Sequence, residues 1–94
     1  MPEDMVFTNH ALERMFARGV TTQEVREAVI ADDVVERRPV AGRPYAVRLL
    51  LGRSRAGPIH VVVADDDVRA RAIVVTVYRP DPERWAPSFR ERRR

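Results

Sequence analysis

Residues 45–79 read YAVRLLLGRSRAGPIHVVVADDDVRARAIVVTVYR, and this stretch determines the fold class. Apolar residues alternate or run together at 45–51, 59–64 and 70–79, which predicts three β-strands. Glycine and proline separate the first two segments, and three aspartates separate the second from the third, so turns are expected there. Because these gaps are short, we expect antiparallel neighbours in one sheet.

A fourth strand and a helix precede this stretch. Residues 34–38 have strand character, and turn residues at 39–44 separate them from the next strand. A first helix is predicted from an N-cap at Thr8 or Asn9 to Gly19, a residue type favoured just after a helix. Its apolar arc should face the core and consists of Ala11, Leu12, Met15 and Phe16.

The second helix has the clearest start. Thr21 followed by Glu24 is a capping box, in which each side chain bonds the backbone N–H of the other residue. Val20 and Val25 stand at the two positions of a hydrophobic staple. We therefore expect this helix to begin directly after Thr21 and to end at the aspartates at 32–33, forming a hairpin with the first helix.

These elements predict a single α+β domain over residues 1–89. A short edge strand at 5–7 and the helical hairpin would pack on a curled four-stranded antiparallel sheet. Prolines at 80 and 82 end the last strand, and a short C-terminal helical segment through Trp85 is expected to follow. Residues 90–94 are four arginines and a glutamate, which we predict to be a mobile basic tail.

Strand alternation predicts which side chains share a face of the sheet. One alternate set is almost wholly apolar and should face the helices: Tyr45, Val47, Leu49, Leu51, Ile59, Val61, Val63, Ile73, Val75 and Val77. The opposite face should then carry four polar residues, which are Arg48, His60, Thr76 and Tyr78. Because sheets twist and curl, we expect this second face to be concave and to hold the functional site.

The composition favours one self-contained cytoplasmic domain. Of the 94 residues 45% are hydrophobic, none is cysteine, and residues 1–5 lack the blocks of an export signal. No apolar run is long enough to cross a bilayer. The formal net charge is +3 and all 17 basic residues are arginine, which suits a polyanionic partner, although GC-rich codon usage explains the missing lysine equally well. The aspartates at 65–67 lack the spacing of a calcium loop, so we predict a plain turn, with neither a metal nor a cofactor.

Three groups of residues resemble a known bacterial family. The first is the helix pattern HA at 10–11, Arg14 and RG at 18–19, the second is the strand IHVV at 59–62, and the third is TVYRP at 76–80 leading to Trp85. Together they are similar to the family called domain of unknown function 4258, which is placed in the RelE/ParE-like toxin superfamily. The resemblance covers almost the whole chain and implies a RelE-like fold.

The resemblance also implies a toxin component, or a toxin-derived member, of a bacterial toxin–antitoxin pair. Superfamily relatives are mostly messenger RNA endonucleases, some acting on the ribosome, while the ParE branch inhibits DNA gyrase. The family itself has no established activity, so the fold carries over better than the function. The implied partners are RNA and a cognate antitoxin protein, often one with a zinc-binding module, that covers the concave face.

RNA cleavage by the 2′-hydroxyl needs a general base, a general acid and cationic donors. His60, Tyr78 and Arg48 can fill these catalytic roles, and the residues predicted to contact nucleic acid are His10, Arg14, Arg18, Thr76 and Arg79. Five of them have a structural alternative: a half-exposed strand histidine at position 60, a packing tyrosine at 78, a helix-end hydrogen bond for His10, and a solvated helix edge for Arg14 and Arg18. Trp85 is interpreted as an anchor for the C-terminal segment.

The sequence therefore leaves three functions open. The first is RNA binding with messenger RNA cleavage. The second is a noncatalytic module that binds nucleic acid or an acidic protein through its arginines. The third, gyrase inhibition, ranks lowest because no residue points to it. Retention of catalysis, ribosome dependence and oligomeric state are not decided by the sequence.

Overall fold

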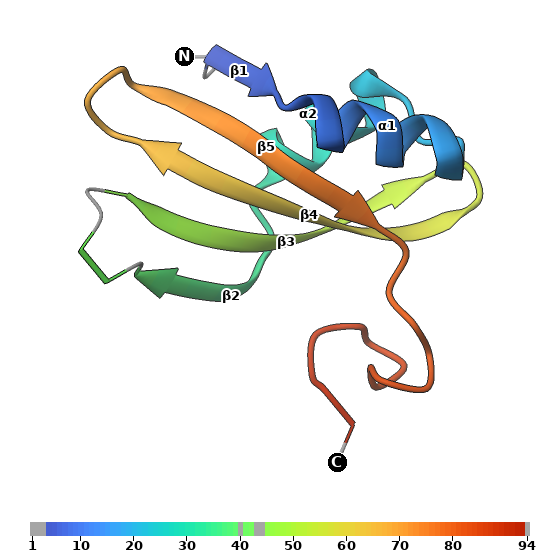
Figure 1. Cartoon of the computed structure of the whole chain (residues 1–94). Helices are drawn as coiled ribbons and strands as arrows, with labels where there is room; N and C mark the ends of the chain where they lie inside the picture. Colours follow the sequence, from blue (N-terminus) through green and yellow to red (C-terminus); the bar gives the residue numbers. More distant parts are fainter. Residues whose placement is uncertain (1–3, 40, 43–44, 94) are drawn as a thin grey trace.

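The computed structural model describes residues 4–39, 41–42 and 45–93, which form two helices and a five-stranded mixed sheet (Figure 1). The helices are α1 (Asn9–Arg18) and α2 (Thr22–Ala31), and the strands are β1 (Asp4–Phe7), β2 (Val34–Pro39), β3 (Ala46–Ser54), β4 (Gly57–Asp66) and β5 (Arg71–Tyr78). The sheet order is β1-β5-β4-β3-β2, with β1 parallel to β5 and the other neighbours antiparallel. The α+β class is confirmed, but the sheet is not the predicted four-stranded antiparallel one, because β1 joins it in parallel as a fifth strand.

Both helices begin and end where their local signals predict. Thr8 Oγ1 accepts a hydrogen bond from the Ala11 N–H at 3.0 Å, and α1 ends at Gly19, whose φ of 66° is left-handed. Thr21 Oγ1 accepts from the Glu24 N–H at 3.1 Å, and the Glu24 carboxylate accepts from the Thr21 N–H at 2.8 Å. The predicted capping box is therefore confirmed.

The buried stripe of α1 is narrower than predicted. Ala11 and Met15 are buried, whereas Leu12 is 42% exposed and Phe16 is 90% exposed. In the structure α1 packs mainly on β5 and α2 mainly on β3, so each helix covers its own part of the sheet (Figure 1). Only the α1 residues that point directly at β5 reach the core.

The core lies between the helices and one face of the sheet. Its fully buried side chains include Val25, Leu50, Ile59, Val61, Val63, Val74 and Val77. Gly52 lets α2 approach β3 closely, because a Cβ at this position would lie 2.5 Å from Ala28 Cβ. The β3 residues Leu50 and Gly52 therefore face the helices.

The predicted faces are correct for β4 and wrong for β3. Leu50 pairs with Val61 and both belong to the core. Consequently Val47, Leu49 and Leu51 lie on the opposite side, which we call the outer face of the sheet. Three successive leucines make both alternate sets of β3 apolar, so alternation could not identify the buried set.

A β-bulge changes the faces within β5. The register shifts between Val62 and Val63, which leaves Val75 as an extra residue on β5. Val74 belongs to the core. Ile73 and Val75, predicted to face the helices, instead line a groove on the outer face.

The chain after β5 lies across the outer face, opposite the helices (Figure 1). The predicted C-terminal helix is a single turn, in which the Trp85 N–H bonds the Asp81 carbonyl at 2.9 Å. A backbone bridge between Trp85 and Arg92 then closes a tight loop. The tail predicted to be mobile covers residues 90–94, of which Arg94 lies outside the described residues. In the structure Arg90 and Arg92 bond the body of the protein, for example from Arg92 to Glu36. We call residues 80–93 the C-terminal strap.

Candidate functional site

His60 and Tyr78 lie side by side on the outer face, as strand alternation predicts. They are paired across β4 and β5. His60 Nδ1 is 3.2 Å from the Tyr78 hydroxyl oxygen, and the two rings meet edge to face with centroids 5.2 Å apart. Two of the three predicted catalytic residues are therefore in contact.

The strap covers His60 completely. The imidazole is 0% exposed, its Nε2 lies 2.8 Å from the Phe89 carbonyl oxygen, and the Trp85 ring packs against it with centroids 4.5 Å apart. Burial lowers the pKa of His60; the Phe89 carbonyl and Glu36 oppose this shift, and Arg92 adds to it. The imidazole is therefore mainly neutral at pH 7. The alternative that position 60 holds a half-exposed strand histidine is wrong, because the side chain is fully buried.

The Phe89 carbonyl also determines which imidazole nitrogen carries the hydrogen. A carbonyl oxygen can only accept, so His60 Nε2 must donate to it. In a neutral ring Nδ1 then has no hydrogen and accepts from the Tyr78 hydroxyl. Burial raises the pKa of Tyr78, so its hydroxyl keeps the proton that it donates.

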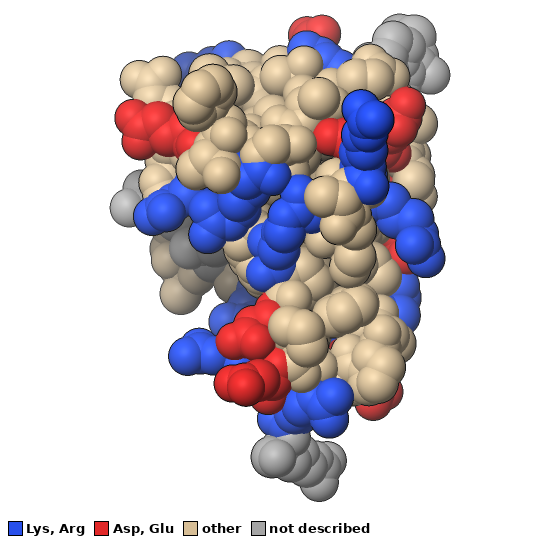
Figure 2. Space-filling view, turned by 90° about the vertical axis from the view of Figure 1, so that its right-hand side faces the viewer, with Lys and Arg blue, Asp and Glu red and all other residues tan. Residues whose placement is uncertain are grey.

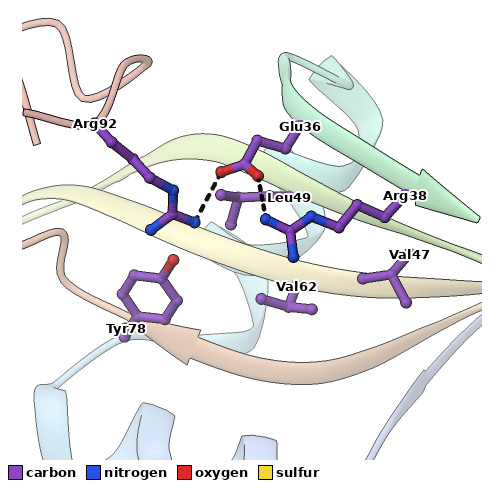
Figure 3. Close-up of a pocket in the computed structure, with 7 residues that line it drawn as sticks. All are labelled: Glu36, Arg38, Val47, Leu49, Val62, Tyr78 and Arg92. Atoms are coloured by element: carbon purple, nitrogen blue, oxygen red, sulfur yellow. Dashed lines mark hydrogen bonds and ion pairs between the residues drawn. The ribbon is translucent and has the colours of Figure 1, made fainter. Parts of the chain in front are cut away.

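A hollow of about 190 Å³ opens beside Tyr78 on the outer face (Figure 3). We call it the Tyr78 hollow, and its lining residues are Glu36, Arg38, Val47, Leu49, Val62, Tyr78 and Arg92. The Glu36 carboxylate lies between two guanidinium groups, accepting from Arg92 Nη2 at 2.9 Å and from Arg38 Nη2 at 3.0 Å. β2, β5 and the strap thus each place a polar side chain at one hollow.

The Tyr78 hollow is suited to an anion. The side chains of Arg38 and Arg92 are 69% and 59% exposed, whereas Glu36 is 26% exposed. Partial burial acts to raise the pKa of Glu36, but the hydrogen bonds from Arg92 and Arg38 outweigh it and the pKa is lowered. Two cations therefore face one carboxylate, and each guanidinium has further N–H donors for a second anion.

Arg48 lies on the helix-facing side, so its predicted place beside His60 and Tyr78 is wrong. It is 4% exposed, with Nη1 at 2.6 Å from Asp32 Oδ1 and Nη2 at 2.7 Å from Asp65 Oδ1. Burial acts to lower the pKa of Arg48, but the two carboxylates outweigh it and raise the pKa. In this position Arg48 joins the end of α2 to β3 and β4.

The residues predicted to bind nucleic acid lie along α1 and the end of β5. His10 Nε2 is 3.1 Å from Thr76 Oγ1, so the Thr76 hydroxyl contacts α1 instead of His60. Arg79 donates to the Arg18 carbonyl at 2.9 Å, and Arg14 is exposed on α1. Figure 2 shows arginine side chains gathered across the end of the molecule where β5 ends and the β3–β4 turn lies. None of the residues predicted to bind nucleic acid lines the Tyr78 hollow.

Three polar residues of the Tyr78 hollow were not predicted from the sequence. Glu36 and Arg38 are two residues apart in β2, and this spacing could have placed both on one face. No local pattern marks Arg92, because its position depends on the strap. Within residues 4–39, 41–42 and 45–93, no group of three or more histidine, aspartate or glutamate side chains could hold a metal ion. Among the same residues no helix is long and apolar enough to cross a membrane.

Comparison with known proteins identifies the family. Residues 7–79 match the family described as Domain of unknown function (DUF4258). No curated protein and no solved structure matches the chain. The matched residues contain both helices and β2 to β5, but the strap lies beyond them. Because the match spans more than half of the length of the chain, the chain belongs to the DUF4258 family.

Proposed function

We propose that this protein binds RNA on the outer face of its sheet and is a RelE/ParE-like toxin, or a toxin-derived member, of a bacterial toxin–antitoxin pair. The observation that carries the RNA proposal is the group of Arg38, Glu36 and Arg92 beside the Tyr78 hydroxyl. Planar guanidinium groups bind phosphate through paired hydrogen bonds, and the nearby tyrosine adds a hydroxyl and a ring face. Together they provide contacts to a phosphate and to its nucleoside.

A toxin role is supported by the resemblance of the sequence to the RelE/ParE-like toxin superfamily. The pattern at 10–19 and the segment TVYRP at 76–80 carry it. The chain has an edge strand, two successive helices and an antiparallel run of strands, and this is also the order of elements expected of a RelE-like fold. The proposed partners are RNA, met free or on the ribosome, and a cognate antitoxin protein in the cytoplasm.

Fluorescence anisotropy with a labelled single-stranded RNA tests the binding site. Arg38→Ala and Arg92→Ala should each weaken binding and reduce the salt dependence by about one counterion per lost contact. The matched control is Arg37→Ala, since this exposed arginine is adjacent in β2 but pairs with Arg48, on the helix-facing side. An equal loss of RNA affinity in Arg37→Ala, or unchanged affinity in both Arg38→Ala and Arg92→Ala, would contradict the assignment of RNA binding to the Tyr78 hollow.

Glu36→Gln provides a second, opposite test of the same site. It removes the carboxylate that occupies both guanidinium groups. If the hollow holds a phosphate, RNA should bind more tightly in this variant, because the competing internal anion is gone. Weaker binding would show that Glu36 itself contacts the ligand.

The Tyr78–His60 hydrogen bond favours RNA cleavage as a second candidate function. In this reaction the ribose 2′-oxygen bonds the adjacent phosphorus while the bond to the 5′-oxygen breaks, leaving a 2′,3′-cyclic phosphate. The 2′-hydroxyl proton passes to the Tyr78 oxygen as the Tyr78 proton passes to His60 Nδ1. The 5′-oxygen takes a proton from water, and the extra proton on His60 Nδ1 returns through the Tyr78 hydroxyl to the hydroxide that remains.

Expression in bacteria separates cleavage from binding alone. If the protein cleaves messenger RNA, induction should stop growth, primer extension should find new 5′ ends, and co-expression of the adjacent gene should restore growth. Tyr78→Phe should abolish the cuts while keeping the ring. Normal growth with intact messenger, together with RNA binding in vitro, would establish the noncatalytic module instead. A supercoiling assay with the purified protein tests gyrase inhibition.

A further inference from the structure

The C-terminal strap lies beyond the residues matched to the family, yet it forms part of the Tyr78 hollow. We propose that the strap completes the hollow as a site that distinguishes RNA from DNA: it places Arg92 to hold a phosphate and, through His60, turns an oxygen lone pair of Tyr78 toward a ribose 2′-hydroxyl. This inference rests on the proposed function and names its ligand chemistry.

Trp85 positions Arg92. The indole is 4% exposed, and the Arg92 guanidinium carbon lies 4.5 Å from its ring centroid. The loop between them is closed by the Ala86 N–H, which bonds the Glu91 carbonyl at 2.7 Å. On the other side Arg92 Nη2 bonds Glu36. The Trp85 ring on one side and the Glu36 carboxylate on the other therefore hold the Arg92 guanidinium at the hollow.

The strap also orients the Tyr78 hydroxyl. The Phe89 carbonyl keeps the hydrogen of the neutral imidazole on His60 Nε2, so the Tyr78 proton points at Nδ1. The remaining lone pairs of the Tyr78 oxygen are then available to the hollow as acceptors. Figure 3 shows this oxygen on the side of the ring nearest Arg92.

An acceptor beside a phosphate site selects for a ligand hydroxyl. In RNA the 2′-hydroxyl can donate to such an oxygen, whereas deoxyribose has no group to offer there. The buried histidine cannot rotate to offer a different hydrogen bond, since both of its nitrogens are already engaged. Tyr78 is therefore the residue that determines specificity, and His60 and Phe89 position it.

Ion pairs hold the far end of the strap to the body. Arg90 bonds the Asp33 carboxylate and donates to the Val34 carbonyl at 3.2 Å. Within the strap, Arg93 Nε donates to the Pro82 and Trp85 carbonyls. These contacts keep the loop closed over His60 and can be weakened one at a time.

Two measurements on the full chain test the proposal. Long-range nitrogen NMR should find wild-type His60 neutral with its hydrogen on Nε2, and anisotropy should find tighter binding to a single-stranded RNA than to the DNA of the same sequence. Tyr78→Phe should reduce this RNA preference about five- to tenfold, the value of one hydrogen bond, while DNA affinity stays within about twofold. Hydrogen on Nδ1, or equal binding of RNA and DNA by the wild type, would overturn it.

Variants in the strap test whether the strap determines the preference for RNA over DNA. Trp85→Ala and the milder Arg90→Ala should mix the two His60 tautomers and reduce the RNA preference together, in protein that circular dichroism shows to be folded. Arg84→Ala is the matched control, because this strap side chain is 84% exposed. A shifted tautomer with an unchanged RNA preference would overturn the inference. If the wild-type protein binds neither RNA nor DNA, the proposed function itself is overturned. If it binds RNA and DNA equally, and Arg38→Ala still weakens this binding, only the present inference is overturned.

Discussion

Replacing Gly52 with alanine tests the placement of β3 against α2. A Cβ at position 52 would lie 2.5 Å from Ala28 Cβ and 3.4 Å from Ile59 Cγ1. Carbon atoms pack at about 3.5–4.0 Å, so α2 and β3 must separate by about 1 Å to admit the methyl group. Because Ala28 has no side-chain torsion that could move its Cβ away, the backbone must shift. Overpacking of this kind costs about 1–3 kcal/mol of the free energy of unfolding.

Urea and thermal unfolding followed by circular dichroism measure the effect. In a domain of this size 1 kcal/mol corresponds to about 4–8 °C in Tm, so a loss of roughly 10 °C is expected for Gly52→Ala. Ala28→Gly alone should cost about 1 kcal/mol through helix propensity. Combined with Gly52→Ala it should remove the clash, so the double variant should be more stable than the two single losses predict. Strict additivity, or wild-type stability of Gly52→Ala, would refute the face assignment of β3 and with it the inward position of Arg48.

Further variants test the buried ion pairs and the pH dependence. Arg48→Ala should lower the free energy of unfolding by about 2 kcal/mol. This loss is smaller than for a fully buried ion pair, because the Asp32 carboxylate is half exposed. A loss below about 0.5 kcal/mol in urea unfolding, which is typical of surface ion pairs, would contradict the prediction. Because the pKa of Glu36 is lowered in the folded protein, ionised Glu36 contributes fully to the free energy of unfolding above about pH 4.5. This contribution is lost as the pH falls through the pKa of Glu36 in the folded protein. Glu36→Gln should therefore flatten the acid side of a plot of stability against pH. Because the pKa of His60 is lowered in the folded protein, the unfolded chain takes up the His60 proton at a higher pH than the folded protein does. The free energy of unfolding should therefore fall as the pH drops below about 6.5. An NMR titration that finds the His60 pKa above that of a free imidazole would contradict this prediction.

The helices could be predicted because their signals are local. Thr8, Thr21 and Glu24 each satisfy a backbone N–H within three residues, and Gly19 adopts the left-handed conformation that ends α1. None of these interactions depends on where the sheet lies. The strand order of β2 to β5 follows in the same way from turns too short to allow crossovers.

The faces of the sheet could be predicted only in part, because two nonlocal events determine them. On β4 the apolar alternation is unambiguous, and His60 accordingly lies opposite the core residues Ile59 and Val61. On β3 the deciding residue is Gly52, whose significance appears only when Ala28 is placed against it. On β5 an extra residue at Val75 changes the alternation, and no composition signal distinguishes a bulge inside a run of valines.

The strap could not be predicted because the residues that order it are distant in sequence. Four arginines among the last five residues are typical of a mobile tail, since charged side chains bury little apolar surface. Arg90 and Arg92 pair with Asp33 and Glu36, which precede them by more than fifty residues, and such exposed ion pairs contribute little each. Trp85 supplies the apolar burial that makes the attachment stable, against a histidine that the sheet itself presents. Arg92 is therefore held at the hollow by the buried Trp85 ring as well as by Glu36, and added salt should loosen residues 90–93 before it loosens Trp85.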